Sequence, residues 1–167
     1  MRHIIGILLQ NEFGALSRVA GLFSSRGYNI ESLSVSVTDD PGLSRITLVT
    51  QGTAAAIQQV VNQLNKLIDV IAVDDMTGED HLERELAIIK LRLRSARREA
   101  VRSLVQQAGG RVLAEERDCL ILELAASEAE VSELVRQLAA EAELLEIVRS
   151  GALAMSRQEH TLHVVES

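Results

Sequence analysis

The same order of strand-like and helix-like segments occurs twice along this chain of 167 residues. In each half, apolar residues at i, i+3, i+4 and i+7 mark two helices, and short apolar or alternating runs mark four strands. The order βαββαβ leaves few topologies, because connections between neighbouring elements are short and do not cross. We therefore expect an α+β protein of two ferredoxin-like βαββαβ units. Each unit should have an antiparallel sheet with both helices on one face.

The first unit is expected to occupy residues 1–75. Its second strand alternates leucine and valine with serine, which is the two-residue period of a strand with one wet face. Residues 39–42 contain the only proline and predict the turn of a hairpin. The expected segments are strands over 3–9, 28–37, 46–50 and 68–73, with helices striped by Leu16, Val19, Ala20 and Phe23 and by Ile57, Val60, Val61 and Leu64.

Residues 76–84 are the expected linker, because they are polar and show no apolar period. The pattern restarts over 85–151, and residues 152–167 are expected to form a polar tail. In each unit one sheet face should be covered by helices and the other open. An open face and free sheet edges favour dimerisation through side-by-side sheets, and a further surface for a different protein.

The composition excludes several classes of partner. A net charge of −7 opposes binding to nucleic acid, since phosphate contacts need clustered lysine and arginine. Only three aromatic residues are present, too few for a base-stacking platform. No stretch approaches the roughly 20 apolar residues of a membrane span, and the N-terminus lacks the layout of a signal peptide. We therefore expect a cytoplasmic protein with no nucleic-acid or membrane partner.

The reactive side chains do not form an enzyme-like set. Cys119 lies in an apolar run and is expected to be a small buried hydrophobe. His3 opens a strand, His81 lies in the expected linker, and His160 and His163 lie in the expected tail. The ligand-like spacing of the last two is better explained by a polar terminus than by a metal site. We expect no catalytic residue, metal site or cofactor in this chain.

The turn over residues 11–16 is the most informative segment, because a strand passes there into a helix that begins at or just after Gly14. Backbone N–H groups at a helix start receive a carboxylate well, and a glycine lets the ligand approach the main chain. The side-chain carbonyl of Asn11 offers an acceptor for an ammonium group. The turn therefore has both complements of a zwitterionic amino acid. The alternative is that Asn11 and Gly14 only form a turn.

Residues 9–19 (LQNEFGALSRV) resemble the opening loop and first helix of an ACT domain, a ligand-binding module of amino-acid metabolism. Residues 26–33 (RGYNIESL) and 38–45 (TDDPGLSR) narrow the resemblance to the regulatory small subunits of acetolactate (acetohydroxyacid) synthase. It extends to residues 69–70, 84–85 and 149–151, so it covers nearly the whole chain. On this basis residues 1–75 would be an ACT domain, and residues 85–151 a second, ACT-like regulatory domain.

The resemblance implies a non-catalytic subunit of branched-chain amino-acid biosynthesis that activates a separate catalytic subunit and confers feedback inhibition by valine or a related amino acid. It also implies a homodimer joined through the ACT domains, with the effector at the interface. One chain would hold the amino and carboxyl groups, and Asn29 and Ile30 of the neighbouring chain would complete the pocket. Thiamine diphosphate, magnesium and FAD would be bound by the catalytic partner. The residues expected to bind the effector are Asn11, Gly14, Ala15, Leu16, Asn29 and Ile30.

Two residues depart from the pattern of that family. Phe13 is bulkier than the small or polar residue expected in this loop, and Ser36 stands where glycine or alanine is usual. Both bear on effector affinity and on the choice between valine, leucine and isoleucine. Two other interpretations stay open: an ACT-type sensor of a different metabolic enzyme, which would not affect acetolactate synthase, and an enzyme on a ferredoxin-like scaffold, which would be active alone.

Overall fold

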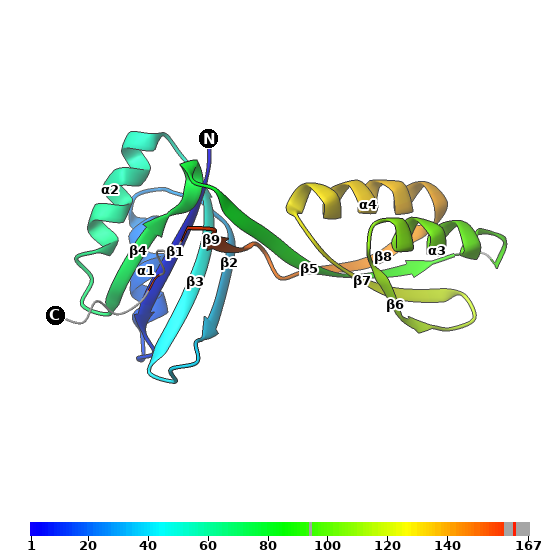
Figure 1. The fold of residues 1–167 in the computed structure, drawn as a ribbon, viewed down its shortest axis with the longest axis horizontal. Helices are drawn as coiled ribbons and strands as arrows, with labels where there is room; N and C mark the ends of the chain where they lie inside the picture. Colours follow the sequence, from blue (N-terminus) through cyan, green and yellow to red (C-terminus); the bar gives the residue numbers. More distant parts are fainter. Residues whose placement is uncertain (94, 159–161, 163–167) are drawn as a thin grey trace. The chain divides into compact units, whose positions relative to one another are not determined.

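The computed structural model describes residues 1–93, 95–158 and 162. They form two compact units, Met1–Leu82 with the described residues from Ala152 onward, and Glu83–Gly151 (Figure 1). Each unit has the order βαββαβ and one four-stranded antiparallel sheet as its frame. The predicted α+β fold of two ferredoxin-like units is therefore confirmed.

The first unit has the strand order β2-β3-β1-β4, with β1 and β3 in the centre and β2 and β4 at the edges. Every pairing along this path is antiparallel. Figure 1 shows both helices of this unit on the same side of its sheet. The elements are β1 (Arg2–Gln10), α1 (Ala15–Ser25), β2 (Ile30–Val37), β3 (Leu43–Gln51), α2 (Ala54–Leu64) and β4 (Val70–Asp75).

The core of the first unit lies between the sheet and its two helices. The stripes predicted for α1 and α2 place Val19, Phe23, Ile57 and Leu64 in it, all at most 1% exposed. Burying each such side chain contributes about 1.5 to 3 kcal/mol, which fixes both helices on this face. Thr53 caps α2 by accepting a hydrogen bond from the N–H of Ala56.

The other face of this sheet is also covered, so the expectation of an open face is wrong for the first unit. Strand β9 (Leu153–Ser156) pairs with β5 (His81–Arg92). Ala154 of β9 and the preceding Ala152 pack on the sheet with Ile4, Val49 and Met76. Arg45 donates a hydrogen bond to the carbonyl of Ala154 at 3.1 Å. The expected tail from residue 152 thus begins with a strand that returns to the first unit.

The expected linker contains regular structure. Met76–Gly78 form a 3-10 helix (η1), with the side chain of Met76 fully buried against the sheet. Strand β5 (His81–Arg92) already begins at His81. The polar composition of this stretch concealed both elements, because its one buried anchor is a single methionine.

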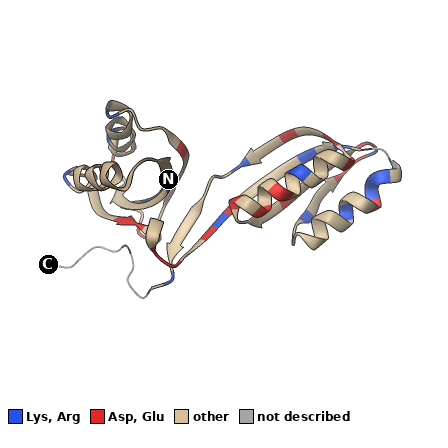
Figure 2. Cartoon of the chain, turned by 90° about the horizontal axis from the view of Figure 1, so that it is seen from above, with Lys and Arg blue, Asp and Glu red and all other residues tan. Residues whose placement is uncertain are grey.

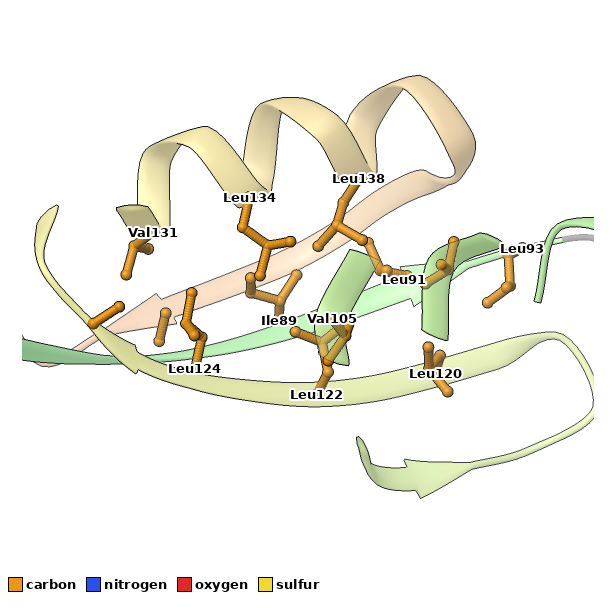
Figure 3. Close-up of a cluster of buried hydrophobic side chains, with 13 residues drawn as sticks. Ile89, Leu91, Leu93, Val105, Leu120, Leu122, Leu124, Val131, Leu134 and Leu138 are labelled. Carbon is orange, nitrogen blue, oxygen red and sulfur yellow. The ribbon is translucent and has the colours of Figure 1, made fainter. Parts of the chain in front are cut away.

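The second unit repeats the frame with the strand order β6-β7-β5-β8. Its apolar stripes pack on one face of the sheet, where Ile89, Leu122, Val131 and Leu138 are fully buried (Figure 3). Ser127 and Glu130 form a capping box at the start of α4 (Glu128–Glu141). The elements are β5, η2 (Ser95–Arg97), α3 (Arg98–Gln107), β6 (Arg111–Glu115), β7 (Cys119–Ala126), α4 (Glu128–Glu141) and β8 (Glu143–Arg149).

The surface of the second unit is mixed in charge and partly apolar. Acidic and basic residues lie side by side on its helices (Figure 2), as in the ion pairs Arg97–Glu141 and Arg136–Glu133. On the sheet, Leu86, Ile88 and Val148 remain 37–56% exposed. Ile88 pairs with Val148, and neither belongs to the buried core cluster of this unit, so they lie on the face away from the helices.

Candidate amino-acid-binding site

The turn between β1 and α1 leaves the start of a helix open. Gly14 is the N-cap of α1 and has φ +83°, a left-handed conformation that side-chain-bearing residues rarely adopt. Among the described residues, no side chain forms a hydrogen bond that caps the start of this helix. The N–H groups of Leu16 and Ser17 in its first turn have no acceptor within the part of the chain that the structure describes. Together with the helix dipole, these groups favour an anion.

Asn11 is held by the β2–β3 hairpin. Its Nδ2 donates to the carbonyl of Pro41 at 3.0 Å, and its Oδ1 accepts from the hydroxyl of Ser44 at 3.2 Å. Its backbone N–H donates to the carbonyl of Gly42 at 2.8 Å. Because a carbonyl oxygen has two lone pairs, Oδ1 keeps capacity for one further donor such as an ammonium group.

An ion pair holds the other side of the turn. Arg18 of α1 donates from Nε to Oδ2 of Asp69 at 2.5 Å, and the side chain of Asp69 is only 9% exposed. The hydrogen bond from Arg18 holds the pKa of Asp69 below its ordinary value, against the opposing effect of burial. The carbonyl of Asp69 also accepts from the N–H of Gln10 at 2.8 Å. This pair was missed in the sequence, because its members are 51 positions apart.

The remaining residues of the turn differ sharply in exposure. Ala15 is buried and fixes the start of α1 against the core, whereas Leu16 is 40% exposed. The side chain of Phe13 is fully exposed. Within a single chain, an apolar leucine and an aromatic ring therefore face solvent beside the open helix start.

Asn29 and Ile30 lie far from this turn in the same chain. Ile30 pairs with Thr50 near the end of β3, and the hydroxyl of Thr50 donates to the carbonyl of Asn29 at 2.6 Å. Gln10, just before the turn, pairs with Leu43 at the opposite end of β3. Thr50 is seven residues further along β3 than Leu43, which corresponds to about 23 Å at the usual rise per residue. The six predicted residues therefore fall into two groups at opposite ends of the sheet.

Strand β2 is an edge strand that leaves apolar side chains uncovered. Val35 is 43% exposed and Val37 is 49% exposed. Ser36 pairs with Arg45, whose side chain reaches β9, so Ser36 lies on the face opposite the helices. Its side chain therefore does not point toward the helix side, where the open turn lies.

No group of three or more His, Cys, Asp or Glu residues among the described positions is arranged to hold a metal ion. His3 is buried and its Nδ1 lies 3.1 Å from the hydroxyl of Thr77, while Nδ1 of His81 lies 2.8 Å from the carbonyl of Glu79. His160 and His163 lie outside the described residues. Cys119 is half-buried at the start of β7. None of the described helices has the length and apolar character needed to cross a membrane.

A hollow of about 760 Å³ lies in the second unit, at the end of its sheet where β5 finishes. Two of its lining arginines are already paired, Arg92 with Glu143 and Arg97 with Glu141. These pairs cancel the positive charge that an anionic ligand would need. The open turn of the first unit is therefore the better candidate site.

Comparison with known proteins assigns both units. Residues 5–72 match the family of ACT domains like that of the AHAS small subunit, and residues 84–158 match the small subunit of acetolactate synthase. The acetolactate synthase small subunit of Haemophilus influenzae is 41% identical over 162 residues, which cover 97% of this chain and 99% of that one. The isozyme 3 small subunit of Escherichia coli is 39% identical over 157 residues, or 94% and 96% of the two chains.

A crystal structure of the acetolactate synthase small subunit from Thermotoga maritima superposes with a TM-score of 0.84, at 32% identity, over 96% of this chain and 99% of that one. The fold and the open turn thus define a two-domain regulatory protein of the ACT class. The chain belongs to the family of acetolactate synthase small subunits. It is a regulatory subunit, and the catalytic activity is on the large subunit.

Proposed function

We propose that this chain activates the catalytic large subunit of acetolactate synthase and makes it sensitive to feedback inhibition by valine or a related branched-chain amino acid. Relatives named as small subunits of that enzyme align over nearly the full length of both chains. This full-length agreement favours the proposal over a sensor of a different metabolic enzyme. The location that fits such a subunit is the cytoplasm, and the thiamine diphosphate, magnesium and FAD of the reaction would be bound by the large subunit.

One observation carries the proposed effector site: the two groups of predicted residues lie at opposite ends of β3. Asn11, Gly14, Ala15 and Leu16 of one chain cannot share a ligand with Asn29 and Ile30 of the same chain. A valine molecule spans far less than the roughly 23 Å between them. A shared pocket therefore requires two chains.

The edge strand β2 provides the geometry for that second chain. When two copies of an edge strand pair across a two-fold axis in antiparallel fashion, the first residue of one strand meets the last residue of the other. Val37 ends β2 beside Ser44, which donates to Asn11. The partner's β2 would thus begin beside the turn, bringing its Asn29 and Ile30 to the Asn11 end. The homodimer would continue both sheets and cover Val35 and Val37.

In this pocket each group has a chemical role. The N–H groups after Gly14 receive the carboxylate of the effector, and Oδ1 of Asn11 accepts from its ammonium group. Ile30 of the second chain, with Leu16, surrounds the branched side chain, and Asn29 supplies a further polar contact. An effector bound between two chains stabilises one dimer geometry over another, and a coupling of about 1 to 3 kcal/mol suffices for substantial inhibition.

Reconstitution with the catalytic large subunit tests the proposal. The purified chain alone should form no acetolactate, should raise the rate of the large subunit when added to it, and should make that rate fall as valine is added. Activation without a response to valine would keep the subunit assignment and remove the effector. No effect on the large subunit would favour the sensor of another enzyme.

A further inference from the structure

The guanidinium group of Arg18 lies beside Gly14, at the open helix start. Arg18 is one helical turn after Gly14, so its side chain reaches back along α1 toward the turn. If Gly14 carried a Cβ atom, that atom would lie 3.0 Å from Nη1 of Arg18. The guanidinium group therefore lies next to the space that the missing side chain of Gly14 leaves free, and it brings a positive charge to the first turn of the helix.

The guanidinium group is fixed on one side and available on the other. Nε donates to Asp69, and Nη2 lies 3.4 Å from the carbonyl of Phe13. Nη1 has no acceptor among the described residues, and the side chain as a whole is 45% exposed. A guanidinium group has five N–H donors in a rigid fork, so the bond to Asp69 leaves donors pointing elsewhere.

Asp69 is suited to hold this group in place. Its side chain is buried, and its backbone carbonyl accepts from Gln10, the last residue before the turn. The carboxylate thus sets the orientation of the guanidinium group relative to the same turn that carries Gly14. An arginine held in this way loses little conformational freedom when a ligand binds, which favours affinity.

We propose that Arg18 binds the carboxylate of the effector through Nη1, together with the N–H groups of the first turn of α1, and that Asp69 is its positioning residue. This inference rests on the proposed function, because it deepens the same site. Charge-assisted hydrogen bonds from guanidinium to carboxylate are about twice as strong as neutral ones. The residue would therefore select ligands with a free carboxylate over their neutral analogues.

The experiment compares valine with valinamide, which keeps the ammonium group and the side chain but lacks the carboxylate. Calorimetric titration of the full chain gives the ratio of the two affinities. In Arg18→Gln we expect valine to bind about 10-fold more weakly or worse, with valinamide little changed, so the ratio should fall by about the same factor. Arg18→Lys keeps the charge and should restore part of the ratio.

Two further variants separate recognition from folding. Arg26→Gln, an exposed arginine just after the same helix, should leave both affinities unchanged. Asp69→Asn should weaken valine less than Arg18→Gln, because the guanidinium group stays but loses its anchor. Circular dichroism shows whether each variant folds. If Arg18→Gln does not fold, the affinities of Arg18→Lys are compared with those of the natural chain instead.

The outcomes distinguish this inference from the function on which it rests. The inference is overturned if the natural chain binds valine and both Arg18→Gln and Arg18→Lys keep the natural chain's ratio of valine to valinamide affinity. Arg18 would then have only a structural role. If the natural chain binds no valine, the proposed effector fails and takes this inference with it. A large fall in the ratio in Arg18→Gln, with smaller falls in Arg18→Lys and Asp69→Asn and none in Arg26→Gln, supports both.

Discussion

Asn11 and Asn29 lie at opposite ends of strand β3. The side chain of Asn11 accepts from Ser44 near one end, and the carbonyl of Asn29 accepts from Thr50 near the other. In the proposed pocket, the turn that carries Asn11 receives the amino and carboxyl groups of the effector, and Asn29 and Ile30 of a second chain complete the pocket. This separation makes the second chain a requirement of the proposed site, and the predictions for Asn29→Ala and for mixed dimers depend on it.

Asn29→Ala should weaken valine binding by about 3- to 10-fold, as expected for the loss of one neutral hydrogen bond of about 1 kcal/mol. The side chain of Asn29 is exposed, so the variant should unfold at the same denaturant concentration as the natural chain. Calorimetry and urea unfolding measure the two quantities. Gln106→Ala, an exposed position on α3, is the matched control. Unchanged valine affinity in Asn29→Ala would count against a shared pocket.

Gly14→Ala should both destabilise the first unit and abolish valine binding. A left-handed conformation costs an alanine about 1 to 2 kcal/mol, and its Cβ would press on Arg18 at 3.0 Å. Gly21→Ala is the control, since Gly21 lies within α1 with open space around it. There alanine should stabilise the helix by about 0.5 to 1 kcal/mol. Urea unfolding measures the free energy of unfolding of both variants. Equal changes in Gly14→Ala and Gly21→Ala would contradict the assigned role of Gly14.

The Arg18–Asp69 pair should make stability depend on acid. Because the folded state lowers the pKa of Asp69, its contribution is present above the ordinary aspartate pKa of about 3.9 and is lost as pH falls through the folded value. Asp69→Asn should therefore be less stable than the natural chain at pH 7, with a gap that shrinks below about pH 4. Urea unfolding at several pH values measures this, with Asp39→Asn as the exposed control. A gap independent of pH would contradict the ion pair.

Two neighbouring positions of β9 should differ in how strongly an introduced charge destabilises the fold. Ala154 is 6% exposed and packs on the sheet, whereas Met155 is 63% exposed. Ala154→Asp should lower the free energy of unfolding by at least about 2 kcal/mol, because it buries an unpaired carboxylate. Met155→Asp should change it by less than about 0.5 kcal/mol. If both variants are equally stable, β9 does not cover the first unit in solution.

The helices and central strands were predictable because each carries a period of its own. The stripes of α1 and α2 depend on residues within one segment, and the buried positions Val19, Phe23, Ile57 and Leu64 agree with them. The capping box of α4 is likewise a local pattern of Ser127 and Glu130. Such elements need no knowledge of the rest of the chain.

Strand β9 and the Arg18–Asp69 pair were not predictable in this way. The four residues of β9 alternate small and large side chains, but alanine has a low strand propensity, and the strand is held by Arg45 and Thr47 more than 100 positions away. The 3-10 helix at Met76 was not predictable for a similar reason, because a single buried methionine in a polar stretch produces no apolar periodicity. Long-range partners, rather than local pattern, decide these elements.

The candidate site was partly predictable from local sequence and partly dependent on long-range contacts. The open helix start at or just after Gly14 was predicted from the local sequence of the turn, whereas the left-handed conformation of Gly14 comes from the structure. The separation of Asn11 from Asn29 follows from strand register, which a single chain's pattern only suggests. The role proposed for Arg18 was not predictable from the sequence, because it depends on the position of its guanidinium group beside Gly14 in the folded chain.

The most direct test of the shared pocket mixes two defective variants. Asn11→Ala and Asn29→Ala are unfolded and refolded together, so that chains exchange, and the number of tight valine sites is counted by calorimetry. If one pocket uses Asn11 of one chain and Asn29 of the other, each mixed dimer regains one intact site, and about a quarter of all sites should bind valine normally. If no tight site returns in dimers shown to be mixed, the pocket is not shared between chains and the central claim is wrong.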